Sequence, residues 1–286
     1  MIRNEEFING QTGEILTGQQ ILELLQGENL QESIRKSNYY RIEKSNNEIV
    51  KEFGNFYHMF YGEVLSLQID PQYIIRFLYL CSYVNYDNLL VTGYGKGQIN
   101  LKEFDLQEIL RLSKTELIKT KNVLKEHNLI SIDEDKNIVI NDNYASKGKI
   151  NSKEKTINLE VVRMFEQAIK ELYENANARE HKRLALLIKM LPYINVEHNI
   201  VCKNVEEKDL NKIIPFSLIE LAEMLEYKNP ARLKSDLFAI TVGDEHAFRM
   251  ITDYYGKFFT VNPRVYAKSN NMQRLLSISY NSFRNK

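Results

Sequence analysis

Basic side chains gather in one short segment of an otherwise neutral chain. The 286 residues carry 38 Lys and Arg against 38 Asp and Glu, so the formal net charge is zero. From Arg111 to Lys125, five basic residues stand against Glu116 alone, which gives this segment a local net charge of +4. Positive charge concentrated in this way is typical of a surface that faces phosphate groups. The alternative is a solvated helix face that is simply rich in lysine.

Helical spacing divides this segment into an inner and an outer face. Leu117, Thr120 and Leu124 recur at intervals of three and four residues, so we expect them in the core. Ser113 and Glu116 form the capping-box pattern that begins a helix, which we expect to run to about His127. A helix of this kind fits the major groove of a duplex, where each base pair displays a distinct pattern of donors and acceptors. The side chains expected to contact a duplex are Arg111, Lys114, Thr115, Lys119, Asn122 and Lys125.

A second segment, residues 229–239, has the same design with less charge. Leu233 and Leu237 are expected to face its core, and Asp236 lowers its net charge. Because this helix is short and less basic, two roles stay open for it: contact with DNA, or dimerisation or effector binding. Its candidate contacts with DNA are Lys228, Arg232, Lys234 and Ser235.

The two segments belong to two related stretches of sequence. Residues 83–91 (YVNYDNLLV) return as residues 193–201 (YINVEHNIV), with one residue added between the two asparagines. Further on, residues 140–144 (INDNY) have their counterpart in residues 261–266 (VNPRVY). Two matches in the same order and at similar spacing indicate a tandem duplication.

Each copy predicts the order helix, strand, helix, turn, helix, hairpin, which is the order of a winged helix. We therefore expect an α+β fold, mostly helical, with two tandem winged-helix domains and an N-terminal helical arm. The arm covers residues 1–66 and includes an aromatic helix near residues 56–65. The first winged helix covers residues 67–146 and the second 159–268, the latter beginning with a long amphipathic helix. A basic linker (147–158) separates them, and a basic segment (269–286) follows.

Three further segments bear on where DNA would lie. The linker is rich in lysine, and Lys147 and Lys149 are its candidate DNA contacts. The first hairpin ends in Asp133, Glu134 and Asp135, which phosphates would repel, so we expect it to stay off the backbone. The C-terminal segment is basic but partly apolar, and docking on protein competes there with contact to DNA.

Sequence patterns for catalysis are thin. The five histidines form no pair at metal-ligand spacing, and the glycines at 93, 95 and 97 lack the length and the following helix of a phosphate-binding loop. We expect a protein without enzymatic activity, cofactor or metal. Cys81 and Cys202 suit buried thiols of a reducing compartment, the N-terminus is polar, and no apolar run is long enough for a membrane span. We therefore expect the protein to be cytoplasmic.

The chain resembles the winged-helix replication proteins of plasmids and phages of low-GC Gram-positive bacteria, the RepL-like and related initiator families. The resemblance rests on residues 9–15 (NGQTGEI), on the stretch 56–67 and on the Asn-Pro pair within residues 262–266. Two winged helices in place of one make the chain similar also to tandem winged-helix initiators, in which both domains touch origin repeats.

The resemblance implies a sequence-specific protein for double-stranded DNA that initiates replication, recruits host replication proteins and dimerises when it represses its own gene. Lys114, Thr115, Lys119 and Asn122 would then read bases or hold phosphates, with Arg232, Lys234 and Ser235 as their counterparts. Two alternatives stay open: a transcriptional regulator that uses the same helices, and a protein-interaction adaptor that binds no DNA.

Overall fold

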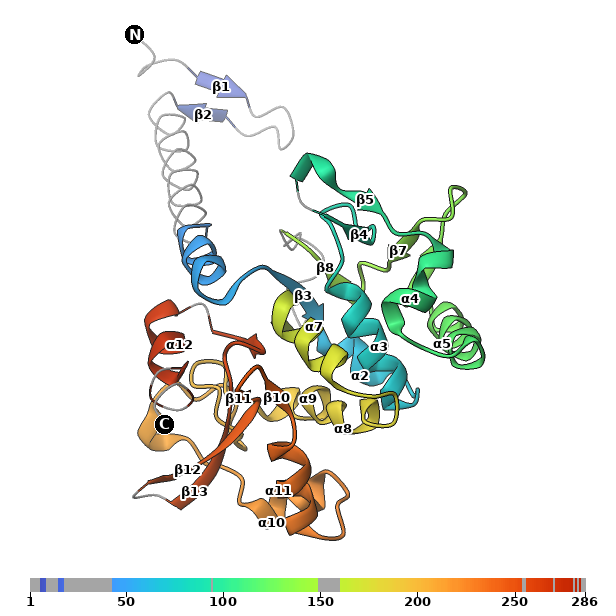
Figure 1. Cartoon of the computed structure of the whole chain (residues 1–286). Coiled ribbons are helices and arrows are strands. Elements are labelled where there is room, and N and C mark those ends of the chain that lie inside the picture. The colour runs from blue at the N-terminus through green and yellow to red at the C-terminus, as the bar shows by residue number, and fades with distance from the viewer. Residues whose placement is uncertain are drawn as a thin grey trace. The chain divides into compact units, whose positions relative to one another are not determined.

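The computed structural model describes residues 6–8, 15–17, 43–93, 95–148, 160–253, 256–269, 271–279, 281 and 283 (Figure 1). The chain divides into two compact units, Met1–Glu48 and Ile49–Lys286. In the first unit, β1 (Glu6–Ile8) and β2 (Ile15–Thr17) form an antiparallel hairpin. All the candidate DNA contacts fall in the second unit, and the predicted boundaries at 66 and 158 both lie inside it.

The centre of the second unit is a four-stranded antiparallel sheet in the order β14-β9-β3-β8. Its strands are β3 (Phe56–Phe60), β8 (Ala145–Ser146), β9 (Val161–Phe165) and β14 (Tyr266–Ala267). The prediction of continuous helices through residues 56–65 and from residue 159 was therefore wrong. Each stretch is a strand followed by a helix, α2 (Tyr61–Ser66) and α7 (Glu166–Asn175). Strand pairing with a distant partner overrides local helical spacing at both places.

The pairing of β3 with β9 is symmetric about one residue pair. His58 lies opposite Arg163, and Met59 and Tyr57 lie opposite Val162 and Met164. Since β3 is followed directly by α2 and β9 by α7, His58 and Arg163 hold the same position in their strands. At the sheet edges, β8 pairs with β3 and β14 with β9, which repeats the symmetry. The second unit is thus built from a first half (residues 56–148) and a second half (residues 161–269).

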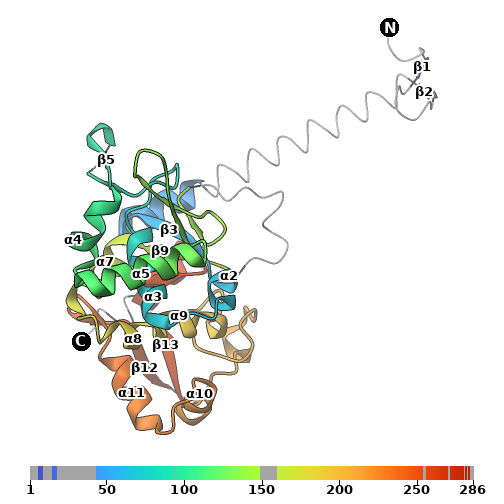
Figure 2. The same cartoon turned by 90° about the vertical axis from the view of Figure 1, so that its right-hand side faces the viewer.

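Each half carries helices and two-stranded antiparallel sheets around this central sheet (Figures 1 and 2). The first half contains α3 (Pro71–Cys81), β4 (Val91–Thr92), β5 (Ile99–Asn100), α4 (Leu106–Leu110), α5 (Lys114–Glu126), β6 (Ile130–Ile132) and β7 (Ile138–Ile140). The second half contains α8 (His181–Leu184), α9 (Leu186–Lys189), α10 (Leu218–Met224), α11 (Pro230–Phe238), β10 (Thr241–Val242), β11 (Glu245–His246), β12 (Phe248–Asp253) and β13 (Gly256–Val261). Short 3-10 turns cover Gly95–Gly97, Glu103–Asp105, Leu191–Tyr193 and Leu210–Lys212, and α12 (Met272–Ser279) follows the second half.

The repeated asparagine turns fold alike in the two halves. Asn85 Oδ1 accepts hydrogen bonds from two backbone amides of its turn, and Asn195 Oδ1 does the same. Further along, Asn88 and Asn199 both have a positive φ, of 59° and 51°. Short polar side chains tolerate this left-handed conformation. The sequence repeat therefore corresponds to a repeat of hydrogen bonds, and the predicted α+β class is confirmed.

One apolar core joins the halves. Tyr79 on α3 stacks on Tyr173 on α7, with ring centroids 3.9 Å apart and planes at 8°. The thiols of Cys81 and Cys202 are buried and unpaired, as expected, and burial raises the pKa of both. Within the described residues, no helix combines the length and apolar character that crossing a bilayer requires.

Candidate nucleic-acid interface

Helix α5 presents its predicted outer face to solvent. Thr120 and Leu124 are buried, at 0% and 1% exposure, and Leu117 packs against the core. Figure 2 shows α5 lying across the outside of the first half. The burial pattern predicted for this helix is confirmed, because the candidate contacts on it are all exposed: Lys114, Thr115, Lys119, Asn122 and Lys125. Arg111, just before the helix, is exposed as well.

A buried arginine fixes α5 to the body of the protein. Arg76 on α3 is only 1% exposed and donates from Nη1 to Thr120 Oγ1 at 2.7 Å and to Glu116 Oε2 at 3.3 Å. Since α3 is rooted in the core, this contact holds α5 in one orientation. Arg76 is not among the residues predicted from the sequence, although a single arginine within the apolar run of residues 74–81 is a signal that could have identified it.

The positive charge of this helix is partly compensated. Two of its lysines and the preceding Arg111 make ion pairs: Arg111 with Glu174 at 3.4 Å, Lys119 with Glu116 at 3.4 Å and Lys121 with Glu103 at 2.8 Å. Lys114 and Lys125 have no ion-pair partner in the part of the chain that the structure describes. Surface pairs of this kind contribute roughly 0–1 kcal/mol each, so the paired side chains remain available to a phosphate.

Helix α11 is the counterpart of α5 and offers less charge. Leu233, Leu237 and Asp236 are buried, and Arg232 Nε lies 3.2 Å from Asp236 Oδ2. Lys234 is half-buried, with Nζ 5.5 Å from the centre of the Phe238 ring. Three of the predicted outer residues, Lys228, Arg232 and Ser235, are exposed. The helix is accessible, but its Arg232 already forms an ion pair with the buried Asp236.

Lys147 does not lie in a solvated linker. Lys147 was expected in a solvated linker, yet its side chain is only 17% exposed and lies 2.6 Å from Glu166 Oε1. That prediction was wrong because Lys147 directly follows strand β8, which fixes it against α7. Lys149 lies outside the described residues.

The first hairpin has an ordered acidic tip. Lys102 Nζ donates hydrogen bonds to Asp135 O at 2.9 Å and to Asn137 Oδ1 at 2.7 Å. The Asn137 side chain donates to the Asp133 carboxylate, and this hydrogen bond is the main cause that lowers the pKa of Asp133. The Asp133 carboxylate is therefore charged at neutral pH. That this hairpin stays off a phosphate backbone remains a prediction.

In the described part of the chain, no group of three or more His, Cys, Asp or Glu side chains is placed to hold a metal ion. Comparisons with protein-family models, with curated proteins and with solved structures found no match.

Proposed function

We propose that this protein binds double-stranded DNA sequence-specifically through α5, with α11 as the corresponding helix of a second, related winged-helix domain. The observation that carries the proposal is the outer face of α5. Lys114 and Lys119 supply charge there, and Thr115 and Asn122 supply groups that hydrogen-bond to base edges, while the inner face is fixed through Arg76. Charge for phosphates and neutral polar groups for bases are the two components of specific recognition.

The internal symmetry supports a mode of binding in which one chain uses both helices. Because the halves are related about the His58 and Arg163 pair, α5 and α11 hold equivalent places in them. One chain would then recognise two stretches of one site, the first more strongly because α5 is more basic. This suits a plasmid or phage replication initiator on origin repeats, and equally a regulator on an operator.

A protein-interaction adaptor is the second candidate, favoured by exposed apolar residues that recur in both halves. Ile99 and Phe104 are 67% and 78% exposed, and Ile214 and Ile219 are 54% and 62% exposed. Ile99 and Phe104 flank the turn before α4, in which Lys102 N donates a hydrogen bond to the Asp105 carboxylate. Ile214 and Ile219 flank the start of α10, where Ser217 N donates in the same way to the Glu220 carboxylate. Apolar side chains exposed at equivalent positions are typical of a surface that contacts another protein.

Footprinting of the full-length protein on the DNA that flanks its own gene tests the proposal. Protected tandem direct repeats would indicate an initiator, and a protected palindrome a regulator. The salt dependence of the affinity separates both from the adaptor, because several phosphate contacts make binding fall by an order of magnitude or more over modest increases in salt. Absence of any protected site, with no salt-dependent binding, would refute DNA recognition.

A further inference from the structure

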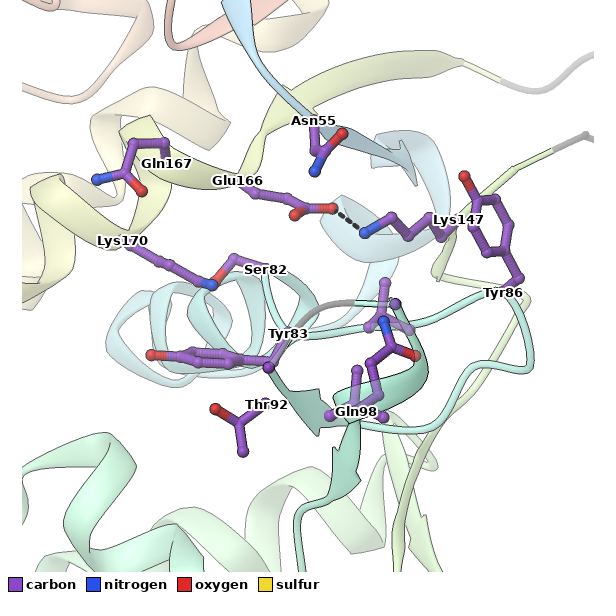
Figure 3. Close-up of a pocket in the computed structure, with 14 residues that line it drawn as sticks. Asn55, Ser82, Tyr83, Tyr86, Thr92, Gln98, Lys147, Glu166, Gln167 and Lys170 are labelled. Atoms are coloured by element: carbon purple, nitrogen blue, oxygen red, sulfur yellow. Dashed lines mark ion pairs between the residues drawn. The ribbon is translucent and has the colours of Figure 1, made fainter. Parts of the chain in front are cut away.

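A cavity of about 450 Å³ lies between α7 of the second half and, in the first half, the end of α3 and the loop that holds Gly93, Gly95 and Gly97, here called the glycine loop (Figure 3). Its volume lies in the range of roughly 300–1,000 Å³ that is usual for small-molecule sites. The lining is polar: Lys147, Glu166, Gln167 and Lys170 lie on the α7 side, with Asn55, Ser82, Thr92 and Gln98 around them. The rest of the wall is formed by Tyr83, Val84, Tyr86, Val91, Gly93 and Gly95.

The corresponding place in the second half is filled by a lysine. Lys147 and Lys268 directly follow the equivalent strands β8 and β14, and Glu166 and Tyr61 begin the equivalent helices α7 and α2. Lys268 Nζ donates to Tyr61 Oη at 2.8 Å, to Leu191 O at 2.7 Å and to Ile194 O at 3.3 Å. The second half thus uses its lysine to satisfy its own backbone carbonyls.

Lys147, the counterpart of Lys268 in the first half, forms an ion pair at the equivalent position. Glu166 takes the position that corresponds to Tyr61, and Lys147 pairs with its carboxylate at 2.6 Å. The position that corresponds to Leu65 is Lys170, one helical turn further along α7. Equivalent positions in the two halves therefore differ: Lys268 is held by hydrogen bonds within the protein, whereas Lys147 and Lys170 line an open, charged cavity.

Lys170 is the second lysine in the lining of this cavity. It is half-buried, its Nζ lies 3.9 Å from the centre of the Tyr83 ring, and within the described residues it has no hydrogen-bond or ion-pair partner. Burial, above all, lowers its pKa. The carboxylates of Glu166 and Glu174 act on this lysine in the opposite direction. With two lysines and one glutamate in its lining, the cavity has a net charge of +1, which an anion would balance.

The glycine loop shapes the opposite wall. Gly93 has a φ of +83°, and a Cβ placed there would lie 2.5 Å from Gly97 O, so only glycine fits this close turn of backbone. Gln98, directly after the loop, and Thr92, directly before it, both line the cavity. Neutral polar groups on this wall suit hydroxyl or amide groups of a bound molecule.

We propose that this cavity binds a small phosphate monoester, with its phosphate on Lys170 and its polar body against Thr92 and Gln98. The occupant would touch both halves at once, because Lys170 belongs to the second half and the glycine loop to the first. This site is independent of DNA binding, and its test needs no DNA.

Titration of the ¹⁵N-labelled full chain with ribose 5-phosphate, AMP and inorganic phosphate, followed by NMR, tests the assignment. We expect saturable shifts of the Gly93, Gln98 and Lys170 amides. Ribose 5-phosphate binding tighter than inorganic phosphate would support the polar wall, and an added gain with AMP would show that a base fits too. Shifts confined to α5, or acetate binding as well as the phosphates, would overturn the proposal.

Two variants with opposite expectations keep the test sharp. Lys170→Met removes the free charge and should weaken phosphate binding about tenfold, the value of one charge-assisted hydrogen bond. Glu166→Gln releases Lys147 and should tighten it. Lys189→Met, which removes one exposed lysine of α9, is the matched control and should change nothing. Equal affinities for all four folded proteins would refute the site.

Discussion

His58 and Arg163 occupy the same position in the two halves of this protein and lie opposite each other in the paired strands β3 and β9. The symmetry axis of the duplication therefore passes through one residue pair. The two residues are no longer alike in their contacts. Arg163 Nη1 donates to Ser269 O at 2.9 Å, while burial, followed by the charge of Arg163, lowers the pKa of His58 to about 4.

DNA binding is expected to depend on the exposed lysines of α5. Changing Lys114→Ala and Lys119→Ala together should weaken duplex binding by roughly 1 kcal/mol per lost phosphate contact and lower the salt slope by about one per contact. Fluorescence anisotropy at several salt concentrations measures both quantities. The control variant Lys51→Ala with Lys189→Ala removes the same charge from exposed residues outside α5 and α11. It should leave the affinity and its salt slope unchanged. A folded α5 variant with the affinity of the natural protein would exclude α5 from the interface.

Arg76 is expected to be the residue on which the position of α5 depends. Arg76→Ala leaves a cavity and removes the buried donor to Thr120 and Glu116, so the free energy of unfolding should fall by about 2–5 kcal/mol. Urea denaturation measures this change. Arg179→Ala on the surface should stay within about 0.5 kcal/mol of the natural protein. A similarly small effect at Arg76 would show that its buried contacts do not stabilise the fold.

The structure predicts a loss of stability in mild acid that depends on His181. This side chain is 2% exposed and stacks on Tyr173 at 4.4 Å, and burial, followed by the charge of Arg76, lowers its pKa to about 4. The unfolded chain binds the proton below about pH 6.5, so stability should fall from pH 6.5 to pH 4, by on the order of 2 kcal/mol from this residue.

His181→Phe keeps the stacking and removes the titration, so its stability should depend less on pH in that range. Denaturation curves at pH 7, 5.5 and 4.5 give the comparison. His127→Gln, at a half-exposed position, serves as the control. Parallel pH profiles for the natural protein and His181→Phe would contradict the prediction.

Lys268 should act in the alkaline range. Burial lowers its pKa to about 8, against about 10.4 for an unfolded lysine. Between these values the unfolded state binds more protons, so the contribution of Lys268 to stability rises from pH 8 to pH 10 and is constant below pH 8. Lys268→Met should remove this rise, as measured by urea denaturation at pH 7.5, 8.5 and 9.5. A variant whose stability still rises with pH as steeply as that of the natural protein would assign the effect to other groups.

The sequence alone determined those features whose physics is local. The faces of α5 follow from helical spacing, its start follows from Ser113, and the paired asparagine turns follow from side chains that bond to their own backbone. These interactions lie within a few residues of one another, so a pattern in the sequence is enough to predict them.

Only the tertiary structure decided how the halves join and which lysines are free. Residues 56–60 and 161–165 have helical spacing, yet they form strands because each finds its partner about a hundred residues away. In the same way, Lys147 pairs with Glu166 instead of lying in a solvated linker, and Lys170 lines a cavity. These features depend on pairing between distant strands and on burial, and neither can be predicted from the spacing of neighbouring residues.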